Sequence, residues 1–360
     1  MGHIFLVWVT GTQINSAKRL QFPIVCVIFA RRMIQCNDII LAYSNDSEVR
    51  QRATSGGIGS ALVNRLFVQG RIKSAISFEY DETLLKYRPC IVASAEDYAV
   101  SGSIYHEINL YAYIREHIEE IKSPFLCFAL PCQINPIKTL LDKKGIESYI
   151  VELTCSSQQT FEATEYLLKR VGISKSDVSS IRYRGEGWPG GVCITLKDGE
   201  AIRIPNNNSV WMRIFHSHLF VMPRCFFCRA DRETASDIKL ADPWGVDSPA
   251  LEKLGRTFCH VKSEKMATVL NEMAQEGLIS FECRSEKEFV QSQYGTIVRK
   301  NYNMRHPRFT KIMKSVLHNN VYRKSVLSLP FLFGMHCFFY TYGCRCLYKL
   351  DKILGKEIVR

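Results

Sequence analysis

Two cysteines in the middle of the chain have the spacing of a metal-binding pair. Cys225 and Cys228 lie in the run Pro-Arg-Cys-Phe-Phe-Cys-Arg, and a Cys-x-x-Cys turn lets two thiolates reach the same metal ion or iron-sulfur cluster. Because a pair is half of a site, two more thiolates are needed. Cys132 and Cys155 are the candidates, since each follows an apolar run typical of a buried strand. For either of them alone, a small buried apolar side chain is the alternative interpretation.

A loop of small residues lies near the start of the recognisable pattern. Thr54, Ser55, Gly56 and Gly57 directly precede an amphipathic run at residues 61–67. Such a loop exposes backbone N–H groups at the positive end of a helix dipole, which suits a phosphate. The loop has neither a Walker lysine nor a complete dinucleotide fingerprint, so an ordinary helix N-cap is the alternative.

A second irregular loop runs from residue 181 to residue 191 and contains four glycines, a proline and Trp188. Glycines of this kind let the backbone approach a flat ligand closely, and the indole of Trp188 would cover an aromatic ring. A β-turn without a ligand is the alternative.

The elements that position the cysteines follow an alternating order. Residues 124–130 and 149–153 form apolar runs typical of buried strands, and residues 134–143 between them have a helical pattern. A strand, helix, strand order is typical of a parallel α/β unit. The sequence therefore predicts an α/β (α+β) fold, in which a mixed, partly parallel sheet is flanked by helices and carries a cysteine-ligated cluster loop region.

The composition is that of a globular protein. Of the 360 residues, 46% are hydrophobic and 23% are charged, which excludes a wholly disordered chain. The net charge of +12 favours acidic partners. Because the basic residues are scattered and no nucleic-acid-binding module is present, we predict no nucleic-acid partner. Fourteen cysteines without a secretory signal predict a cytoplasmic protein whose thiolates bind metal.

The C-terminal region differs in composition from the rest of the chain. Residues 326–344 contain no Asp, Glu, Lys or Arg, are rich in Phe, Leu and Tyr, and are flanked by basic residues. Three interpretations stay open: a membrane-spanning helix, a peripheral helix that binds membrane or a partner, and a packed terminal helix. We predict peripheral membrane contact through residues 326–350, at the inner face of the membrane.

Seven short blocks occur in a fixed order between residues 36 and 310. They are Arg-x-x-Ala-Thr-Ser-Gly-Gly, Gly102-Ser103-x-Tyr105, Pro131-Cys132-Gln133, Cys155, Tyr183-Arg-Gly-Glu-Gly-Trp-Pro-Gly190, Cys225-x-x-Cys228 and Asp237-Ile-x-x-x-Asp242-x-Trp244-Gly245. In these blocks the chain resembles the coenzyme F420 hydrogenase/dehydrogenase beta-subunit family of iron-sulfur flavoproteins.

The resemblance implies an oxidoreductase that passes electrons between a two-electron donor or acceptor, FAD and a [4Fe-4S] cluster. It implies a redox partner protein or a small-molecule electron donor. The residues implied at the FAD are Thr54, Ser55, Gly56, Gly57, Gly102, Ser103, Tyr105 and Trp188. The implied cluster ligands are Cys132, Cys155, Cys225 and Cys228.

The chain departs from the family pattern at three places. Residues 1–36 hold only Cys26 and Cys36, so the usual N-terminal ferredoxin-like module is missing. Ala129-Leu130 replaces the usual Gly-Thr before Pro-Cys, and Ile104 replaces a usual lysine. Two alternatives to the redox function follow: a structural zinc protein that uses the same four cysteines, and a non-catalytic membrane or complex scaffold with relic cofactor sites.

The order of these features divides the chain into four predicted parts. They are an unassigned N-terminal segment at residues 1–36, an FAD-binding α/β part at 37–180, a cluster-bearing part at 181–310, and a basic and aromatic tail at 311–360.

Overall fold

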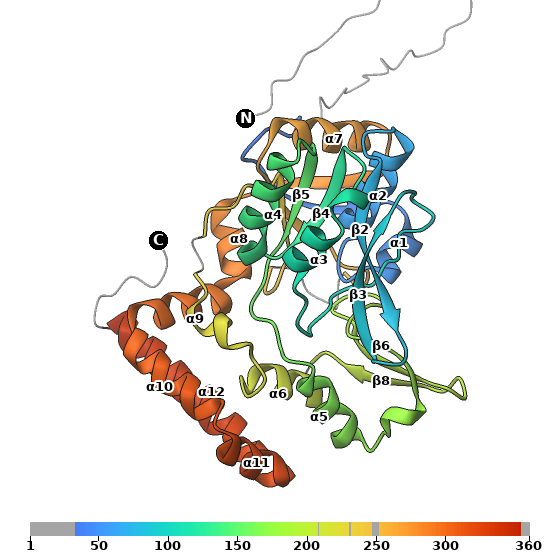
Figure 1. Ribbon diagram of the computed structural model, residues 1–360. Helices are drawn as coiled ribbons and strands as arrows, with labels where there is room; N and C mark the ends of the chain where they lie inside the picture. Colours follow the sequence, from blue (N-terminus) through green and yellow to red (C-terminus); the bar gives the residue numbers. More distant parts are fainter. Residues whose placement is uncertain (1–32, 208, 230–231, 247–251, 354–360) are drawn as a thin grey trace, which may run out of the picture.

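The computed structural model describes residues 33–353, apart from residue 208, residues 230–231 and residues 247–251. A large sheet with helices around it forms one half of the molecule, and a small sheet lies beneath it (Figure 1). The C-terminal helices form an elongated layer along one side.

The large sheet has eight strands. Their order is β11 (Ile279–Arg284), β1 (Ile39–Ser44), β10 (Thr257–Val261), β9 (Ile238–Ala241), β5 (Ser148–Leu153), β4 (Phe125–Ala129), β2 (Ser74–Asp81) and β3 (Lys86–Val92).

The sheet combines parallel and antiparallel pairing. Strands β9, β5, β4 and β2 are parallel neighbours. Strand β1 pairs antiparallel with both β10 and β11, β10 pairs antiparallel with β9, and β2 with β3. This arrangement confirms the predicted mixed, partly parallel sheet flanked by helices. Strands that precede residue 180 and strands that follow it lie in the same sheet. The division into parts at residues 37–180 and 181–310 stays a prediction.

The main core lies between this sheet and four helices. They are α2 (Ile58–Val68), α3 (Leu110–Glu116), α4 (Pro131–Lys143) and α7 (Glu264–Gln275). Each helix buries residues three or four apart, such as Ile134, Ile137 and Leu141 of α4. Successive side chains of β1 face opposite ways: Ile40 enters this core, whereas Leu41 packs with Phe289 of α8 (Glu286–Ser292).

A second core surrounds the small antiparallel sheet of β6 (Val178–Arg182), β7 (Gly191–Leu196) and β8 (Ala201–Pro205). It also includes α5 (Glu162–Val171), α6 (Val210–His216) and the 3-10 helix η3 (Pro223–Phe227), which carries Cys225. The remaining short helices are α1 (Ser47–Arg52), η1 (Ile118–Glu120) and η2 (Lys175–Asp177).

The C-terminal region is helical. Helices α9 (Tyr294–Arg305), α10 (Pro307–Leu317) and α11 (Asn320–Ser328) lead into the 24-residue α12 (Pro330–Ile353). Polar contacts fasten α12 to the body: the His336 ring bonds the Ser217 carbonyl at 2.9 Å, and the Tyr340 hydroxyl bonds His218 Nδ1 at 2.7 Å. Within the described ranges, no helix combines the length and the apolar character needed to cross a bilayer. The contacts of His336 and Tyr340 pack one side of α12 against the body, while large side chains on its other side are exposed.

The end of the predicted N-terminal segment joins the core. Ile34 is buried, and its backbone N–H and C=O both bond the side chain of Asn271 on α7 at 2.8 Å. Residues 1–32, including Cys26, lie outside the described residues.

Candidate functional site

The carboxyl ends of three parallel strands open onto one large cavity. Residues 128–130 at the end of β4, 153–155 at the end of β5 and 240–242 at the end of β9 all line it, and its volume is about 1540 Å³. The carboxyl edge of a parallel sheet is the usual place for a ligand in α/β folds. The strand positions thus explain why Cys155 and Asp242, far apart in the sequence, face the same space.

The small-residue loop forms one wall of this cavity. Thr54, Ser55 and Gly57 line it, together with the first residues of α2. Gly57 has a φ of +79° at the N-cap of α2, and no side chain caps this helix. An uncapped helix N-terminus leaves N–H groups without intrahelical partners, which suits an anion in the cavity.

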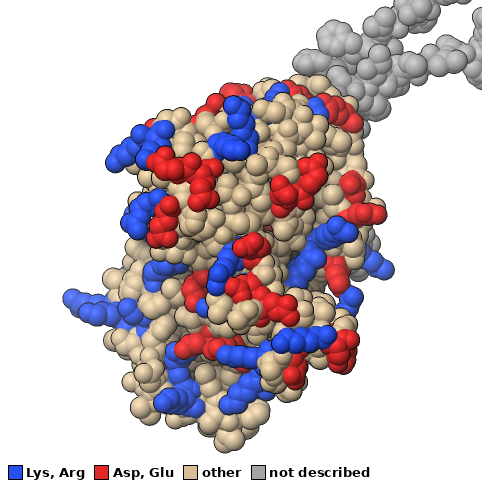
Figure 2. Space-filling model, turned by 45° about the vertical axis from the view of Figure 1, so that its right-hand side comes forward, with Lys and Arg blue, Asp and Glu red and all other residues tan. Residues whose placement is uncertain are grey.

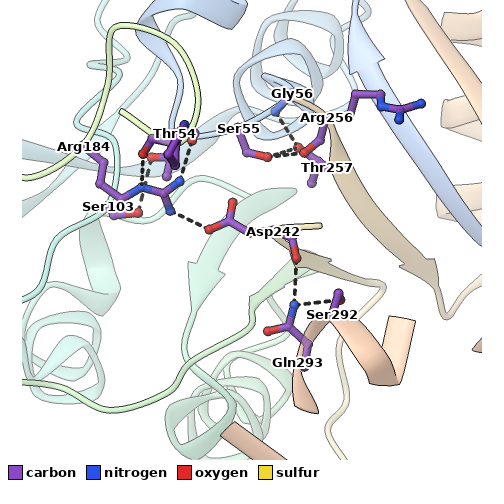
Figure 3. Close-up of polar contacts among 11 residues, drawn as sticks. Thr54, Ser55, Gly56, Ser103, Arg184, Asp242, Arg256, Thr257, Ser292 and Gln293 are labelled. Carbon is purple, nitrogen blue, oxygen red and sulfur yellow. Dashed lines mark hydrogen bonds and ion pairs between the residues drawn. The ribbon is translucent and has the colours of Figure 1, made fainter. Parts of the chain in front are cut away.

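Gly56 has a different environment from its neighbours. It does not line the cavity, and its N–H donates to Thr257 Oγ1 at 2.9 Å, as Figure 3 shows. An added Cβ at Gly56 would lie 2.6 Å from the carbonyl oxygen of Ala42 and 2.8 Å from the backbone nitrogen of Thr257. The structure therefore gives Gly56 a packing role between β1 and β10, and it does not place this residue at a phosphate.

The residues of the second matched block meet the first loop. Gly102, Ser103 and Tyr105 line the cavity, and the Ser103 hydroxyl donates to Thr54 Oγ1 at 3.3 Å. Gly102 has a φ of +71°, and a Cβ there would lie 2.8 Å from the Arg184 carbonyl oxygen. Burial raises the pKa of the Tyr105 hydroxyl, so this group stays protonated at neutral pH.

A buried arginine ties the parts of the site together (Figure 3). Only 3% of the Arg184 side chain is exposed, and its guanidinium bonds the Asp242 carboxylate at 2.5 Å and the Thr54 carbonyl at 3.0 Å. Burial lowers the pKa of Arg184, but Asp242 and Tyr105 together outweigh it, and the pKa is raised. On the other side of Asp242, the Gln293 amide donates to its backbone carbonyl at 2.8 Å.

Trp188 lies outside the cavity lining. It is buried against Trp244 with ring centroids 5.4 Å apart, and its backbone N–H donates to the Lys253 carbonyl at 2.6 Å. The structure therefore does not place this indole over a ligand in the cavity. Trp188 joins the loop of residues 183–190 to the segment that follows β9.

The four predicted ligand thiols are close enough for electrostatic effects on the pKa of Cys132 and of Cys155. Burial raises the pKa of Cys132, and the thiols of Cys228 and Cys225 raise it further. Burial also raises the pKa of Cys155 to about 12, with additional contributions from the other three thiols. Cys132 begins α4 directly after β4, and Cys155 follows the neighbouring β5, so the sheet brings these two together.

Cations stand close to these thiols. Arg224 and Arg232 oppose the rise in the pKa of Cys132, and Lys300 opposes it at Cys155. The Lys300 ammonium also bonds the Cys155 carbonyl at 2.7 Å, and Arg299 bonds the Ser156 carbonyl at 2.6 Å. Positive groups in these positions favour thiolates over thiols.

The thiols do not surround a single ion. Among the residues that the structure describes, no group of three or more His, Cys, Asp or Glu side chains has a geometry for holding one metal ion. In a [4Fe-4S] cluster each cysteine binds a different iron, so its four ligands stand farther apart than around one ion.

Helix α12 forms the opposite wall of the cavity, a role that sequence reasoning missed. Its residues 337, 340–342, 344–346, 348 and 349 line the space, together with α9 and the segment around His218. No spacing in the sequence indicated that a tail roughly 100 to 200 residues beyond these strand ends would return to the site. Residues 342, 345, 346 and 349 of this wall are also exposed to solvent, so they lie at the rim of the cavity.

The cavity lining is positively charged. In the part of the chain that the structure describes, its one acidic side chain is Asp242, which Arg184 neutralises, while its further cations are Arg213, Arg299, Arg345 and Lys349. By contrast, acidic and basic side chains are interspersed on the outer face in Figure 2. The interior is therefore a better environment for an anion than that outer face is.

Comparisons with known proteins agree with this arrangement. Two sequence profiles of the "Coenzyme F420 hydrogenase/dehydrogenase, beta subunit" match the chain, the N-terminal profile at residues 39–115 and the C-terminal profile at residues 124–287. The fold is similar to a chain of the F420-reducing [NiFe] hydrogenase complex from Methanosarcina barkeri. The TM-score is 0.53 at 14% identity, over 74% of this chain and 91% of that one.

The two profiles together span the glycine loop, all four predicted ligand cysteines and the Arg184–Asp242 pair. They match in chain order and end before α9 begins. This chain therefore belongs to the coenzyme F420 hydrogenase/dehydrogenase beta-subunit family, and with it to the oxidoreductases.

Proposed function

We propose that this chain is an iron-sulfur flavoprotein that passes electrons between a two-electron donor or acceptor, FAD and a [4Fe-4S] cluster. The observation that carries the proposal is the position of Cys155. This residue lines the same cavity as the small-residue loop. In addition to burial, the thiols of Cys132, Cys225 and Cys228 raise its pKa electrostatically. A flavin in the cavity would thus adjoin a cluster held by these four thiols.

The cavity suits an FAD in size and charge. The usual ligand pocket is roughly 300–1,000 Å³, so a cavity of about 1540 Å³ has room for a dinucleotide and for part of a second molecule. We assign the diphosphate to the free N–H groups of Gly57 and the start of α2, beside Thr54 and Ser55. Gly102, Ser103 and Tyr105 complete the flavin-binding wall.

The thiol site suits a cluster in its ligand type and its surroundings. Four cysteinate ligands are the usual set for a [4Fe-4S] cluster, and the nearby Arg224 and Lys300 would offset their negative charge. When bound, FAD supplies two-electron chemistry and the cluster supplies one-electron transfer. The residues of this chain would bind these groups. Burial keeps the Tyr105 hydroxyl protonated, and Arg184 holds the small-residue loop through the Thr54 carbonyl.

This proposal places the two sites across the predicted boundary at residue 180. Cys132 and Cys155 come from the part predicted to bind FAD, and Cys225 and Cys228 come from the part predicted to carry the cluster. The electron donor would be a redox partner protein or a small molecule. We keep a cytoplasmic location as a proposal that follows from the cysteine chemistry.

The test is a cysteine replacement in anaerobically purified protein. We expect wild-type protein to be brown and to contain flavin together with roughly four irons per chain. Cys228→Ser should lose most of the iron and its one-electron transfer, and it should keep the FAD. The matched controls are Cys193→Ser and Cys283→Ser, which lie on β7 and β11 away from the thiol set and should keep their iron.

Four results would reject the ligand assignment or the redox function. Full iron content in the Cys228 variant, or an equal loss of iron in a control, would mean that the four-cysteine set is wrong. A colourless protein with bound zinc would identify the structural alternative. A chain without flavin, iron or zinc after anaerobic purification would identify the scaffold alternative.

The flavin site has its own test at Ser60, which lies at the third position of α2 and lines the cavity. A carboxylate there interacts favourably with the helix dipole, so Ser60→Asp should fold at least as well as wild type. The same carboxylate would repel a bound diphosphate, so FAD affinity should fall by more than about tenfold. The control is Ser60→Asn, which is similar in size and uncharged. If Ser60→Asp retains stoichiometric FAD, the phosphate assignment is wrong.

A further inference from the structure

Helix α12 has two faces with different surroundings. Its inner face carries His336 and Tyr340, which contact the body of the protein. Its outer face carries Phe331, Phe338 and Phe339, whose exposed fractions are 72%, 65% and 62%. Met335, Leu350 and Ile353 are also exposed on this helix. Large aromatic side chains exposed in a row on one helix are typical of an interaction surface.

This surface lies in the most basic part of the chain. Residues 289–350 contain ten Lys and Arg side chains and not a single Asp or Glu, so they account for ten of the twelve net positive charges. Arg345 and Lys349 are exposed on α12 itself, and Arg308, Lys311 and Lys324 are exposed on α10 and α11. The layer formed by these helices lies along one side of the molecule (Figure 1).

We infer that the exposed face of α12 binds the surface of an anionic lipid membrane, with α12 lying parallel to it. Phenylalanine side chains on one face and Lys and Arg beside them are the usual composition of an interfacial helix. Basic side chains close to the helix are attracted to anionic headgroups. A second copy of this chain would fit poorly, because it would set the same positive charge against itself.

The surface belongs to this chain and not to the matched family regions. Both sequence profiles end before α9, and α12 begins more than forty residues later. The membrane-binding role is independent of the proposed redox function, since it requires only the folded protein. The inner face of α12 lines the cavity, so binding through the outer face would hold that wall of the cavity against the membrane.

The test is sedimentation of the full chain with lipid vesicles. We expect binding to vesicles of equal parts phosphatidylglycerol and phosphatidylcholine, no binding to pure phosphatidylcholine, and weaker binding as salt increases. The double variant Phe338→Ser/Phe339→Ser should bind at least about tenfold less, because it removes two inserted rings. The control Val68→Ser changes a side chain that is 71% exposed at the end of α2, and it should bind like wild type.

Several outcomes would overturn the inference. These are full-length protein that stays in solution with anionic vesicles, equal binding to neutral vesicles, and a double variant that binds like wild type. A dimer in lipid-free solution that the double variant dissociates would make the face an interface between copies. A second variant, Phe331→Ser/Met335→Ser, repeats the test at other exposed positions on α12 that do not line the cavity. Unchanged thermal unfolding of both variants shows that lost binding is not lost folding.

Discussion

At the scale of single residues, the Arg184–Asp242 ion pair is the contact that the rest of the site depends on. It joins two sequence blocks that lie more than fifty residues apart, and it also fixes the carbonyl of Thr54. A buried ion pair is a weak source of stability as a whole, but the loss of one partner leaves the other charge buried and unpaired. The pair therefore makes the geometry of the site sensitive to either residue.

We predict that Asp242→Asn lowers the free energy of unfolding by roughly 3 kcal/mol, because the Arg184 charge would stay buried without its partner. The measurement is urea unfolding at pH 7. The control is Glu165→Gln, whose partner is Lys175 in a well-exposed surface pair, and it should change stability by less than about 1 kcal/mol. Equal effects of the two substitutions would mean that the Arg184–Asp242 pair contributes no more than a surface contact.

Part of the site could be predicted from the sequence, because its signals lie between residues that are close together in the chain. Cysteines directly after apolar runs, and a small-residue loop before a helix, have short-range signals, and the structure places all of them near the carboxyl edge of the sheet. Gly56 and Trp188 belong to the same blocks, but their contacts are with Thr257 and Trp244, which no local pattern specifies. The sequence therefore predicts that a glycine-containing loop is present. It does not predict which residues of the loop face the cavity and which pack against neighbouring elements.

At the scale of elements, the loop between α1 and α2 is tightly packed. Gly56 lies between the backbones of β1 and β10, with no room for a Cβ. The Ser55 hydroxyl bonds the carbonyl of Arg256, next to β10. A strand near the start of the chain and a strand near its end thus hold this loop between them.

We predict that Gly56→Ala lowers the free energy of unfolding by about 1–3 kcal/mol, because β1 and β10 must separate to admit the methyl group. Thermal unfolding measures the effect. The control is Gly334→Ala on α12, where a Cβ meets no atom within 4 Å, and it should be neutral or stabilise by up to about 1 kcal/mol. A stable Gly56→Ala protein would mean that the two strands are less tightly packed than in the structure.

Most helices and strands with a clear hydrophobic periodicity can be predicted from the sequence, whereas the elements that they pack against cannot. The predicted strand at 149–153 and helix at 134–143 agree with β5 and α4 within three residues. Strands β9 and β10 are only four and five residues long and follow no predicted pattern, yet they link β1 to the parallel strands. The apolar run at residues 326–344 is divided between two helices, because α11 ends at Ser328 and Pro330 begins α12.

At the scale of the whole molecule, buried histidines set the response to acid. His106 accepts the Tyr87 N–H at Nε2, and burial lowers its pKa from 6.5 to about 4. Burial also lowers the pKa of five further histidines, at positions 216, 218, 260, 318 and 336. Each of these side chains is neutral in the folded protein at neutral pH.

We predict that the protein loses stability as the pH falls below about 6.5. Between pH 6.5 and pH 4 the unfolded chain binds a proton at His106 that the folded chain does not, so stability rises with pH across this window and is fully present above it. At pH 5 the loss from His106 alone is about 2 kcal/mol. Urea unfolding at pH 7.5 and pH 5 measures it.

The variant His106→Gln should reduce this pH dependence, because glutamine can accept the Tyr87 N–H and does not titrate. The remaining dependence belongs to the other histidines. An unchanged difference between pH 7.5 and pH 5 in this variant would mean that His106 is free to become protonated in the folded state.

The position of β1 in the sheet also governs when the site can form during synthesis. Strand β1 ends at Ser44, but its partner β10 begins at Thr257, so roughly 200 residues are made between them, which takes on the order of 10–40 s on a ribosome. The hydrogen bonds of Ser55 and Gly56 in the small-residue loop need Arg256 and Thr257, so they form only after these residues emerge. A nascent chain that stops before β10 therefore lacks the partners of the small-residue loop, and a cofactor held by that loop would be acquired only after most of the polypeptide has been made.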